Sequence, residues 1–371
     1  MLISFSKLML LCFSFSAFAE EPKILNIYTW SNYVPQSLIQ KFEDETGIRI
    51  HHSTYVNNEA LYAKLEANPE APYDIIMPSS YFISRMRSHG LIQTIDLSKI
   101  PNHKHLNPLL LGRAHDPEDR YSLPYLWHST GIALNTRYHP LDAPERQGAE
   151  TGIQSVRSGQ QVDALGQGGA QHFKAWADLW RPLKEQLFVL DDARELFGVA
   201  LLTLGYSVNE QDPVRIEAAY QKLKKLMPNI KLFNTDAQQS IYLDEDLTLG
   251  MAWSGDLYLA SLENAHLAMI YPEEGFIIAL DSIAIPKGAQ HVDHAHRFID
   301  FLCRPEIAKA VSLETGYSTA NSAALSMMPE ALRHNSMLYP DQRTMKRGVF
   351  LMDVGRATAI YEKYYERLKL E

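Results

Sequence analysis

Short apolar runs alternate with amphipathic segments over the first ninety residues of the chain. Leu25–Tyr28 predicts a buried strand, and after Pro35 the apolar positions recur at helical spacing until Gly47. Ile48–Ser53 predicts a second strand and Tyr73–Met77 a third, each followed by a further amphipathic segment. The order strand–helix–strand–helix–strand predicts an α/β fold, with a mainly parallel sheet flanked by helices.

The same alternation continues, less regularly, through the rest of the chain. A new pattern begins at Tyr121–Tyr125. The later apolar runs predict strands at Gly131–Asn135, Leu187–Leu190, Leu247–Ala252 and Phe276–Pro286. Cap signals and helical spacing predict helices after Asp191, after Asp212, over Asp293–Leu302, after Arg304 and over Met352–Leu370. Residues 137–172 are rich in Gly, Gln, Ser and Pro, so we expect a long surface insertion there.

The N-terminus has the pattern of an export signal. Lys7 is followed by the apolar stretch Leu8–Phe18, and Ala17-Phe18-Ala19 matches the small-residue cleavage rule. We therefore expect residues 1–19 to be a signal peptide and the mature protein to act in the periplasm. The apolar stretch is too short for a membrane span, and no other segment is long enough. A lipid anchor on Cys12 is disfavoured because Leu11 stands where such signals carry a small residue.

Size, charge and cysteine content narrow the class of protein. With 371 residues and 46% hydrophobic content, the chain favours two lobes over one. Its net charge of −9 argues against a nucleic-acid partner and is compatible with a cationic ligand. Removal of the signal leaves Cys303 as the sole cysteine, which excludes an intramolecular disulfide and predicts a buried apolar filler.

Aromatic and acidic residues recur where predicted strands end. Ligands of open α/β sheets lie beyond the carboxyl ends of the strands, so these residues are expected to share one site. Flat aromatics and carboxylates are the side chains that suit an organic cation. The segments with this character are Trp30–Tyr33, Ser79–Tyr81, Asp191–Glu195, Trp253–Asp256 and Asp281.

Signals for other chemistry are weak. His291, His294 and His296 offer imidazoles for a metal ion, but a polar helix start explains them as well. No nucleophile elbow is present, and Cys303 lies in an apolar helical pattern that disfavours a thiolate. We therefore expect no catalytic residue, metal or cofactor, and a binding protein rather than an enzyme.

Taken together, five motifs resemble the periplasmic spermidine/putrescine-binding proteins of polyamine ABC importers, over nearly the whole mature chain. The motifs are Tyr28–Pro35, Tyr73–Tyr81, Asp191–Glu195, Gly250–Asp256 and Asp281–Pro286. The resemblance implies two α/β lobes joined by crossover strands, with the ligand cleft between them. It places residues 20–128 and 280–325 in one lobe and residues 129–279 and 326–371 in the other.

The resemblance also implies roles for single residues. Trp30, Tyr33 and Trp253 match aromatic walls, while Ser31, Asn32, Ser79 and Tyr81 match neighbouring contacts. Asp192 and Glu195 match an acidic pair that takes an amino group, and Asp281 the carboxylate that holds an internal or distal ammonium. Asp256 is similar to the acid of putrescine-preferring members.

Some of these residues also have structural explanations. Trp253 is compatible with plain core, Tyr81 with a helix surface, and Asp191 with a helix cap more than with a ligand contact. Asp281 has no such explanation, because a carboxylate in an apolar run needs a partner.

Three positions depart from the family pattern. Asn32 stands where Asp or Glu is common, Ala279 where an aromatic usually packs on the ligand, and Leu351 where spermidine binders carry Gln. The ligand's length therefore stays open.

The sequence predicts a monomeric, exported polyamine-binding protein that delivers putrescine or spermidine to the permease of an ABC importer. One alternative is another amine or an amino-acid-like cargo, whose carboxylate would need Arg194. A polyamine sensor on the same fold is another.

Overall fold

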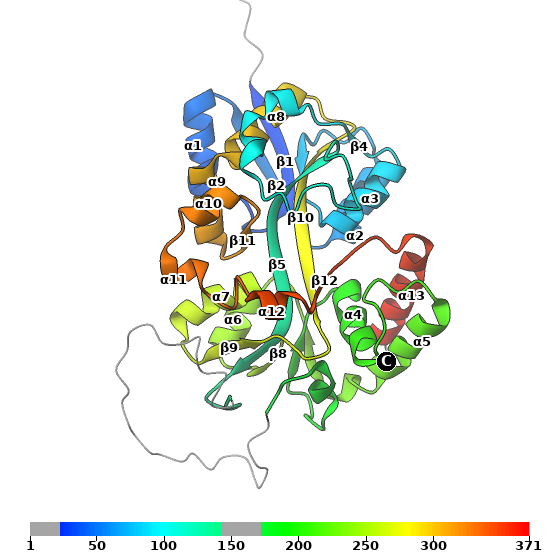
Figure 1. The fold of residues 1–371 in the computed structure, drawn as a ribbon. Helices are drawn as coiled ribbons and strands as arrows, with labels where there is room; N and C mark the ends of the chain where they lie inside the picture. Colours follow the sequence, from blue (N-terminus) through cyan, green and yellow to red (C-terminus); the bar gives the residue numbers. More distant parts are fainter. Residues whose placement is uncertain (1–22, 142–171, 371) are drawn as a thin grey trace, which may run out of the picture.

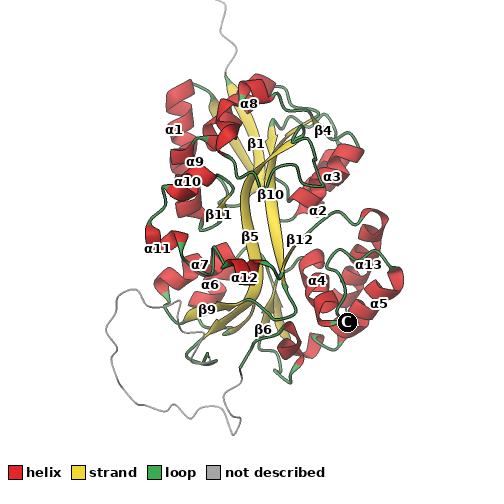
Figure 2. Cartoon of the chain, in the orientation of Figure 1, coloured by secondary structure: helices red, strands yellow, loops and turns green. Residues whose placement is uncertain are grey.

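Two halves joined by long central strands make up the computed structural model, which describes residues 23–141 and 172–370 (Figure 1). The predicted signal peptide and almost all of the predicted insertion at 137–172 lie outside the described residues. Helices flank the strands on both sides in each half (Figure 2).

The first half begins with the predicted alternation of strands and helices. Its opening elements are β1 (Ile24–Trp30), α1 (Gln36–Thr46), β2 (Arg49–Tyr55), α2 (Asn58–Ala67), β3 (Ile75–Ile76) and α3 (Ser80–Ser88). β1 pairs in parallel with both β2 and β3, which confirms the parallel sheet predicted for this segment. The left-handed Gly47 (φ 69°) ends α1, as the sequence predicts.

The remaining strands and helices continue in the same α/β manner. The further strands are β4 (Ile92–Gln93), β5 (Ser122–Asn135), β6 (Leu187–Val189), β7 (Ile230–Phe233), β8 (Leu249–Trp253), β9 (Leu267–Ile270), β10 (Phe276–Pro286), β11 (Ser318–Thr319) and β12 (Gly348–Phe350). The further helices are α4 (Ala193–Thr203), α5 (Pro213–Lys224), α6 (Gln238–Leu243), α7 (Ser254–Glu263), α8 (Val292–Cys303), α9 (Pro305–Thr315), α10 (Ser322–Ser326), α11 (Glu330–Arg333), α12 (Gln342–Met345) and α13 (Thr358–Lys369).

One sheet runs through both halves in the order β2-β1-β3-β10-β5-β8-β6-β7. Pairing is parallel at both ends, where β1 joins β2 and β6 joins β7, and antiparallel in the middle, where β10 joins β5. β5 and β10 extend from one half into the other (Figure 1). The separate runs at Tyr121–Tyr125 and Gly131–Asn135 thus fall, except for Tyr121 itself, within one 14-residue strand. Polar residues between them, such as His128, hid this continuity from the pattern.

Each half has its own hydrophobic core. Phe42 packs edge-on against Phe298 in the first half, with ring centroids 5.0 Å apart. Phe197 packs likewise against Tyr361 in the second half, at 5.4 Å. Cys303 is buried in the first core, where burial raises the pKa of its thiol to about 12. The predicted apolar filler is therefore confirmed.

The last helix starts later than predicted. Residues 352–357 form a turn and a short 3-10 segment, and α13 begins only at Thr358. Gly355 has a left-handed φ of 55°, and its N–H donates to the Asp353 carboxylate at 2.9 Å. This side-chain turn competes with the helix.

The predicted lobe boundaries stay a prediction. Within the described ranges, no helix combines the length and apolarity needed to cross a bilayer.

Candidate ligand-binding site

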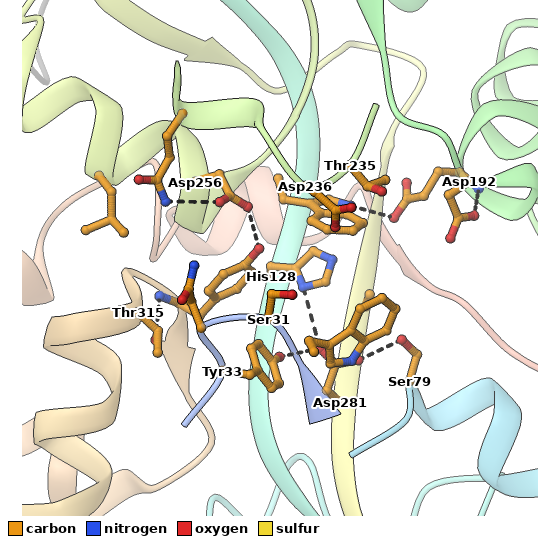
Figure 3. Close-up of a pocket in the computed structure, with 18 of the residues that line it drawn as sticks. Ser31, Tyr33, Ser79, His128, Asp192, Thr235, Asp236, Asp256, Asp281 and Thr315 are labelled. Carbon is orange, nitrogen blue, oxygen red and sulfur yellow. Dashed lines mark hydrogen bonds and ion pairs between the residues drawn. The ribbon is translucent and has the colours of Figure 1, made fainter. Parts of the chain in front are cut away.

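A cavity of about 460 Å³ lies where the two halves meet, with β5 and β10 passing behind it (Figure 3). All eleven residues selected from the sequence line it. Ala279 and Leu351, the departures noted above, line it as well. Lining residues that the sequence did not indicate are Asn58, His128, Thr235, Asp236, Ala237, Gln239, Ser240, Leu259, Glu314, Thr315 and Tyr317. The geometry brings the candidates together, while their roles in binding stay a prediction.

Asp281 is held by two hydroxyl groups in the wall of this cavity. It lies on β10 next to a register shift at Asp281/Ser282, and it is 3% exposed. Ser79 donates its hydroxyl to Oδ1 at 2.6 Å, and Tyr33 donates its hydroxyl to Oδ2. Burial raises the pKa of the Asp281 carboxyl to about 6, although these hydrogen bonds oppose the rise. Neither donor carries a charge, so the carboxylate is buried without a cationic partner.

Asn58 orders the contact loop that follows β3. Its Nδ2 donates to the hydroxyls of Ser79 (3.1 Å) and Tyr81 (3.2 Å), and its Oδ1 accepts the Ser79 N–H at 3.0 Å. Tyr81 is buried inside the cavity wall, which excludes the helix-surface interpretation. Asn57 is the residue that caps α2, which leaves the Asn58 amide free for this loop.

The loop after β1 supplies aromatic walls from the first half. Trp30 is anchored by a hydrogen bond from Nε1 to the Met77 carbonyl at 2.9 Å. Ser31 and Asn32 are exposed at the rim, whereas Tyr33 is buried. Asn32 has a left-handed φ of 56°, a conformation that Asn tolerates better than other non-glycine residues. This backbone demand explains why an amide suits the position.

The second half contributes an acidic pair at the start of α4. Asp192 is the N-cap, and its Oδ1 accepts the Glu195 N–H at 2.9 Å. Glu195 is 2% exposed and receives the Trp253 Nε1–H at 3.3 Å, while its Oε2 has no partner within the described chain. Burial and the neighbouring Asp192 raise the pKa of the Glu195 carboxyl to about 8.

The cap assignment made from the sequence is therefore wrong by one residue. Asp191 does not cap α4, because its carboxylate accepts hydrogen bonds from the Tyr365 hydroxyl and from Lys369 Nζ on α13. Sequence spacing alone does not separate two adjacent aspartates in front of a helix.

Asp256 forms a further acidic position on α7. Tyr317 donates its hydroxyl to Asp256 Oδ2, and Gln239 donates to Oδ1 at 3.2 Å. Burial raises the pKa of the Asp256 carboxyl. The Tyr317 ring lies so close to Gly255 that a Cβ there would meet it at 2.8 Å. Gly255 thus allows the tyrosine to reach the acid, a contact that the sequence gave no means of finding.

The two tryptophans meet across the cavity. Their ring centroids lie 6.4 Å apart at an angle of 77°. Trp253 is only partly buried and contacts hydrophobic clusters of both halves, so it is not plain core.

No lysine or arginine lines the described cavity. Arg194, the candidate for a ligand carboxylate, is buried elsewhere. Its guanidinium donates to the carbonyls of Met352 and Val208 and to Asn209 Oδ1. The cavity therefore presents carboxylates without facing protein cations.

The histidines near α8 have structural partners. His291 Nδ1 lies 3.0 Å from the Asp74 carboxylate, and His294 Nδ1 lies 2.8 Å from the Ile24 carbonyl. His296 Nε2 accepts the Asp96 N–H at 2.9 Å. Among the described residues, no group of three or more potential ligands could hold a metal ion.

Comparison with known proteins identifies the kind of fold and its relatives. The family model for bacterial extracellular solute-binding proteins matches residues 37–332. The spermidine/putrescine-binding periplasmic protein of Salmonella typhimurium is 40% identical over 355 residues, which span 95% of this chain and 94% of the relative. The putrescine-binding periplasmic protein PotF of Escherichia coli is 29% identical over 351 residues, which span 89% and 87%. The structure of the spermidine/putrescine substrate-binding protein PotD of Streptococcus pneumoniae superposes with a TM-score of 0.73 at 31% identity, over 94% of this chain and 99% of that one.

Proposed function

This chain belongs to the family of bacterial extracellular solute-binding proteins, and we propose that it binds a polyamine in the periplasm and delivers it to the permease of an ABC importer. Solute binding, not catalysis, is the function of this family. The predicted two-lobed α/β fold agrees with the solved relatives.

One observation carries the assignment of a polycation: the described lining of the cavity holds no lysine or arginine, but it holds six carboxylate side chains, Asp192, Glu195, Asp236, Asp256, Asp281 and Glu314. Burial raises the pKa of Glu195 and Asp281, which means that their charged forms are costly unless a cation pairs with them. An ammonium group placed between such carboxylates removes this cost. A ligand with several ammonium groups can do so at each position, whereas a neutral or anionic ligand cannot.

The walls between the acids suit methylene chains. Trp30 and Trp253 provide flat aromatic faces, each worth about 0.5–2 kcal/mol to a neighbouring cation. Leu259 and Leu351 add aliphatic surface to the lining. Charged groups separated by apolar walls match a ligand in which ammonium groups alternate with methylenes.

We propose that the halves close on the ligand by bending at the strands that join them. β5 and β10 extend through both halves, and the lining residues come from both sides. Contacts between the halves include the pair of tryptophans, the hydrogen bond from Tyr317 to Asp256, and an ion pair between Arg85 on α3 and Glu362 on α13 at 3.5 Å. Ligand binding favours the closed form by its differential contacts, and the closed form is then recognised by the permease.

A cargo with its own carboxylate is disfavoured, since Arg194 is engaged outside the cavity and the described lining holds no lysine or arginine. Import is tested by deleting the gene and measuring uptake of labelled putrescine and spermidine. Uptake should fall and should return with the wild-type gene. Unchanged uptake together with polyamine binding in vitro would favour the sensor.

A further inference from the structure

His128 is a buried, unpartnered imidazole in the wall of the cavity, on the crossing strand β5. It is 5% exposed, and neither ring nitrogen has a hydrogen-bond partner within the described chain. Buried polar atoms are almost always paired, so two orphaned nitrogens on a side chain that lines the cavity point to a partner that arrives with the ligand.

The register of the sheet makes room for this ring. His128 lies directly opposite Ala279 on β10, so both side chains project from the same face. A small residue at 279 leaves that space to the imidazole. The ring is held between Trp253 and Tyr317, at centroid distances of 5.1 and 5.4 Å.

The imidazole is neutral at physiological pH, because burial lowers its pKa to about 3. The groups that face it are Asp281 from β10, the Tyr317 ring from the segment after α9, and the uncharged Trp253 from β8. A neutral imidazole has one nitrogen that accepts a hydrogen bond.

The distance from His128 Nδ1 to Asp281 Oδ2 is 4.0 Å, too long for a direct hydrogen bond. Two acceptors that share one tetrahedral nitrogen at about 2.8 Å each lie roughly 4.6 Å apart, and about 4 Å apart when each hydrogen bond bends by about 10°. The gap therefore fits a single nitrogen with two N–H groups. Figure 3 shows His128 and Asp281 between Asp256 on one side and Asp192 on the other, which is where the interior of an extended ligand would lie.

We propose that His128 and Asp281 together hold an internal secondary ammonium of the ligand, one N–H donated to the carboxylate and the other to the imidazole. This inference rests on the proposed polyamine function and narrows it to polyamines with an internal nitrogen. Such a group has two N–H donors and two alkyl chains, and the chains lead toward the acids on either side.

The test compares spermidine with 1,8-diaminooctane, which has the same length but a methylene in place of the internal nitrogen. The affinities of the wild type, His128→Leu and His128→Asn are measured by calorimetry. Leucine removes the acceptor at similar volume, while asparagine keeps an acceptor near the position of Nδ1. Thermal unfolding of each unliganded variant monitors folding.

We expect the wild type to prefer spermidine and His128→Leu to lose about tenfold or more of its spermidine affinity, because a charged donor is left unpaired. Affinity for diaminooctane should change less than about threefold, and His128→Asn should keep most of the preference for spermidine. Equal losses for both ligands in His128→Leu, or no loss, would overturn the role of His128 while leaving polyamine binding intact. Failure of the wild type to bind any polyamine would instead overturn the proposed function. If His128→Leu does not fold, loss of the spermidine preference in a folded His128→Asn overturns the inference.

Discussion

Replacing Asp281 by asparagine should destroy affinity without destroying the fold. The carboxylate is 3% exposed, and only the Ser79 and Tyr33 hydroxyls donate to it. Removing one partner of a buried charge pair costs about 3–5 kcal/mol. Since about 1.4 kcal/mol is a factor of ten, the dissociation constant of the bound polyamine should rise between about 10²- and 10⁴-fold.

The unliganded variant should be at least as stable as the wild type near neutral pH. The pKa of Asp281 is about 6, above the ordinary value of about 3.9, so the folded state binds its proton more tightly than the unfolded state. The wild type therefore loses stability as the pH rises from about 4 through 6, by about 3 kcal/mol in total. Asparagine does not ionise, so the variant avoids this loss of stability. Weaker hydrogen bonds from the two hydroxyl groups cancel only about 1 kcal/mol of that gain.

Calorimetry gives the affinity of Asp281→Asn, and chemical unfolding at pH 4 and pH 7 gives its stability. The matched control is Asp293→Asn at the exposed start of α8, where the carboxylate pairs with Lys99 at 2.7 Å, away from the cavity. The control should bind like the wild type. Retention of affinity within fivefold by a folded Asp281→Asn would refute the reasoning, as would an equal loss in the control.

Three further outcomes are expected. Bound ammonium groups favour ionised carboxylates, so the pKa values of Glu195 (about 8) and Asp281 (about 6) should fall on binding. Binding should then release protons, which titrations in two buffers of different ionisation enthalpy detect, and the affinity should rise from pH 6 to pH 8. Proton uptake on binding would contradict this expectation. Trp253→Ala should weaken polyamine binding about tenfold through the loss of a cation–π wall and of the hydrogen bond to Glu195, as seen by calorimetry, and unchanged affinity would count against that wall. Cys303 should resist thiol reagents in the native protein, because burial raises its pKa to about 12; labelling as fast as in denaturant would show that the thiol is accessible.

The hydrophobic pattern of the sequence correctly predicts elements in which burial is uniform from one end to the other. β10 was predicted at Phe276–Pro286 with its observed bounds, because all eleven residues are buried. Only the end of β5, at Gly131–Asn135, was predicted as a strand, because His128 faces a cavity that a one-dimensional pattern does not contain. The start of α13 was misplaced because the turn at Gly355 depends on one side-chain contact.

The residues of the candidate site likewise fall into two groups, those that the sequence indicates and those that it does not. Residues at strand ends, such as Trp30 and Trp253, were accessible because chain direction and sheet order bring strand ends together. Asp281 lies in the middle of β10 and not at its end, so for this residue the expectation of a strand-end position was wrong. Tyr317 and His128 were not accessible, since their positions depend on the close approach to Gly255 and on the register opposite Ala279. Both are properties of the assembled sheet and its packing, which no local motif encodes.

The most direct test of the central claim is a calorimetric titration of the mature protein with putrescine, cadaverine, spermidine and spermine. The account predicts saturable binding of at least one of them with a dissociation constant of about a micromolar or tighter, and spermidine ahead of the diamines. Absence of both binding heat and thermal stabilisation with all four would contradict it, and would mean that the acidic cavity takes a different cargo.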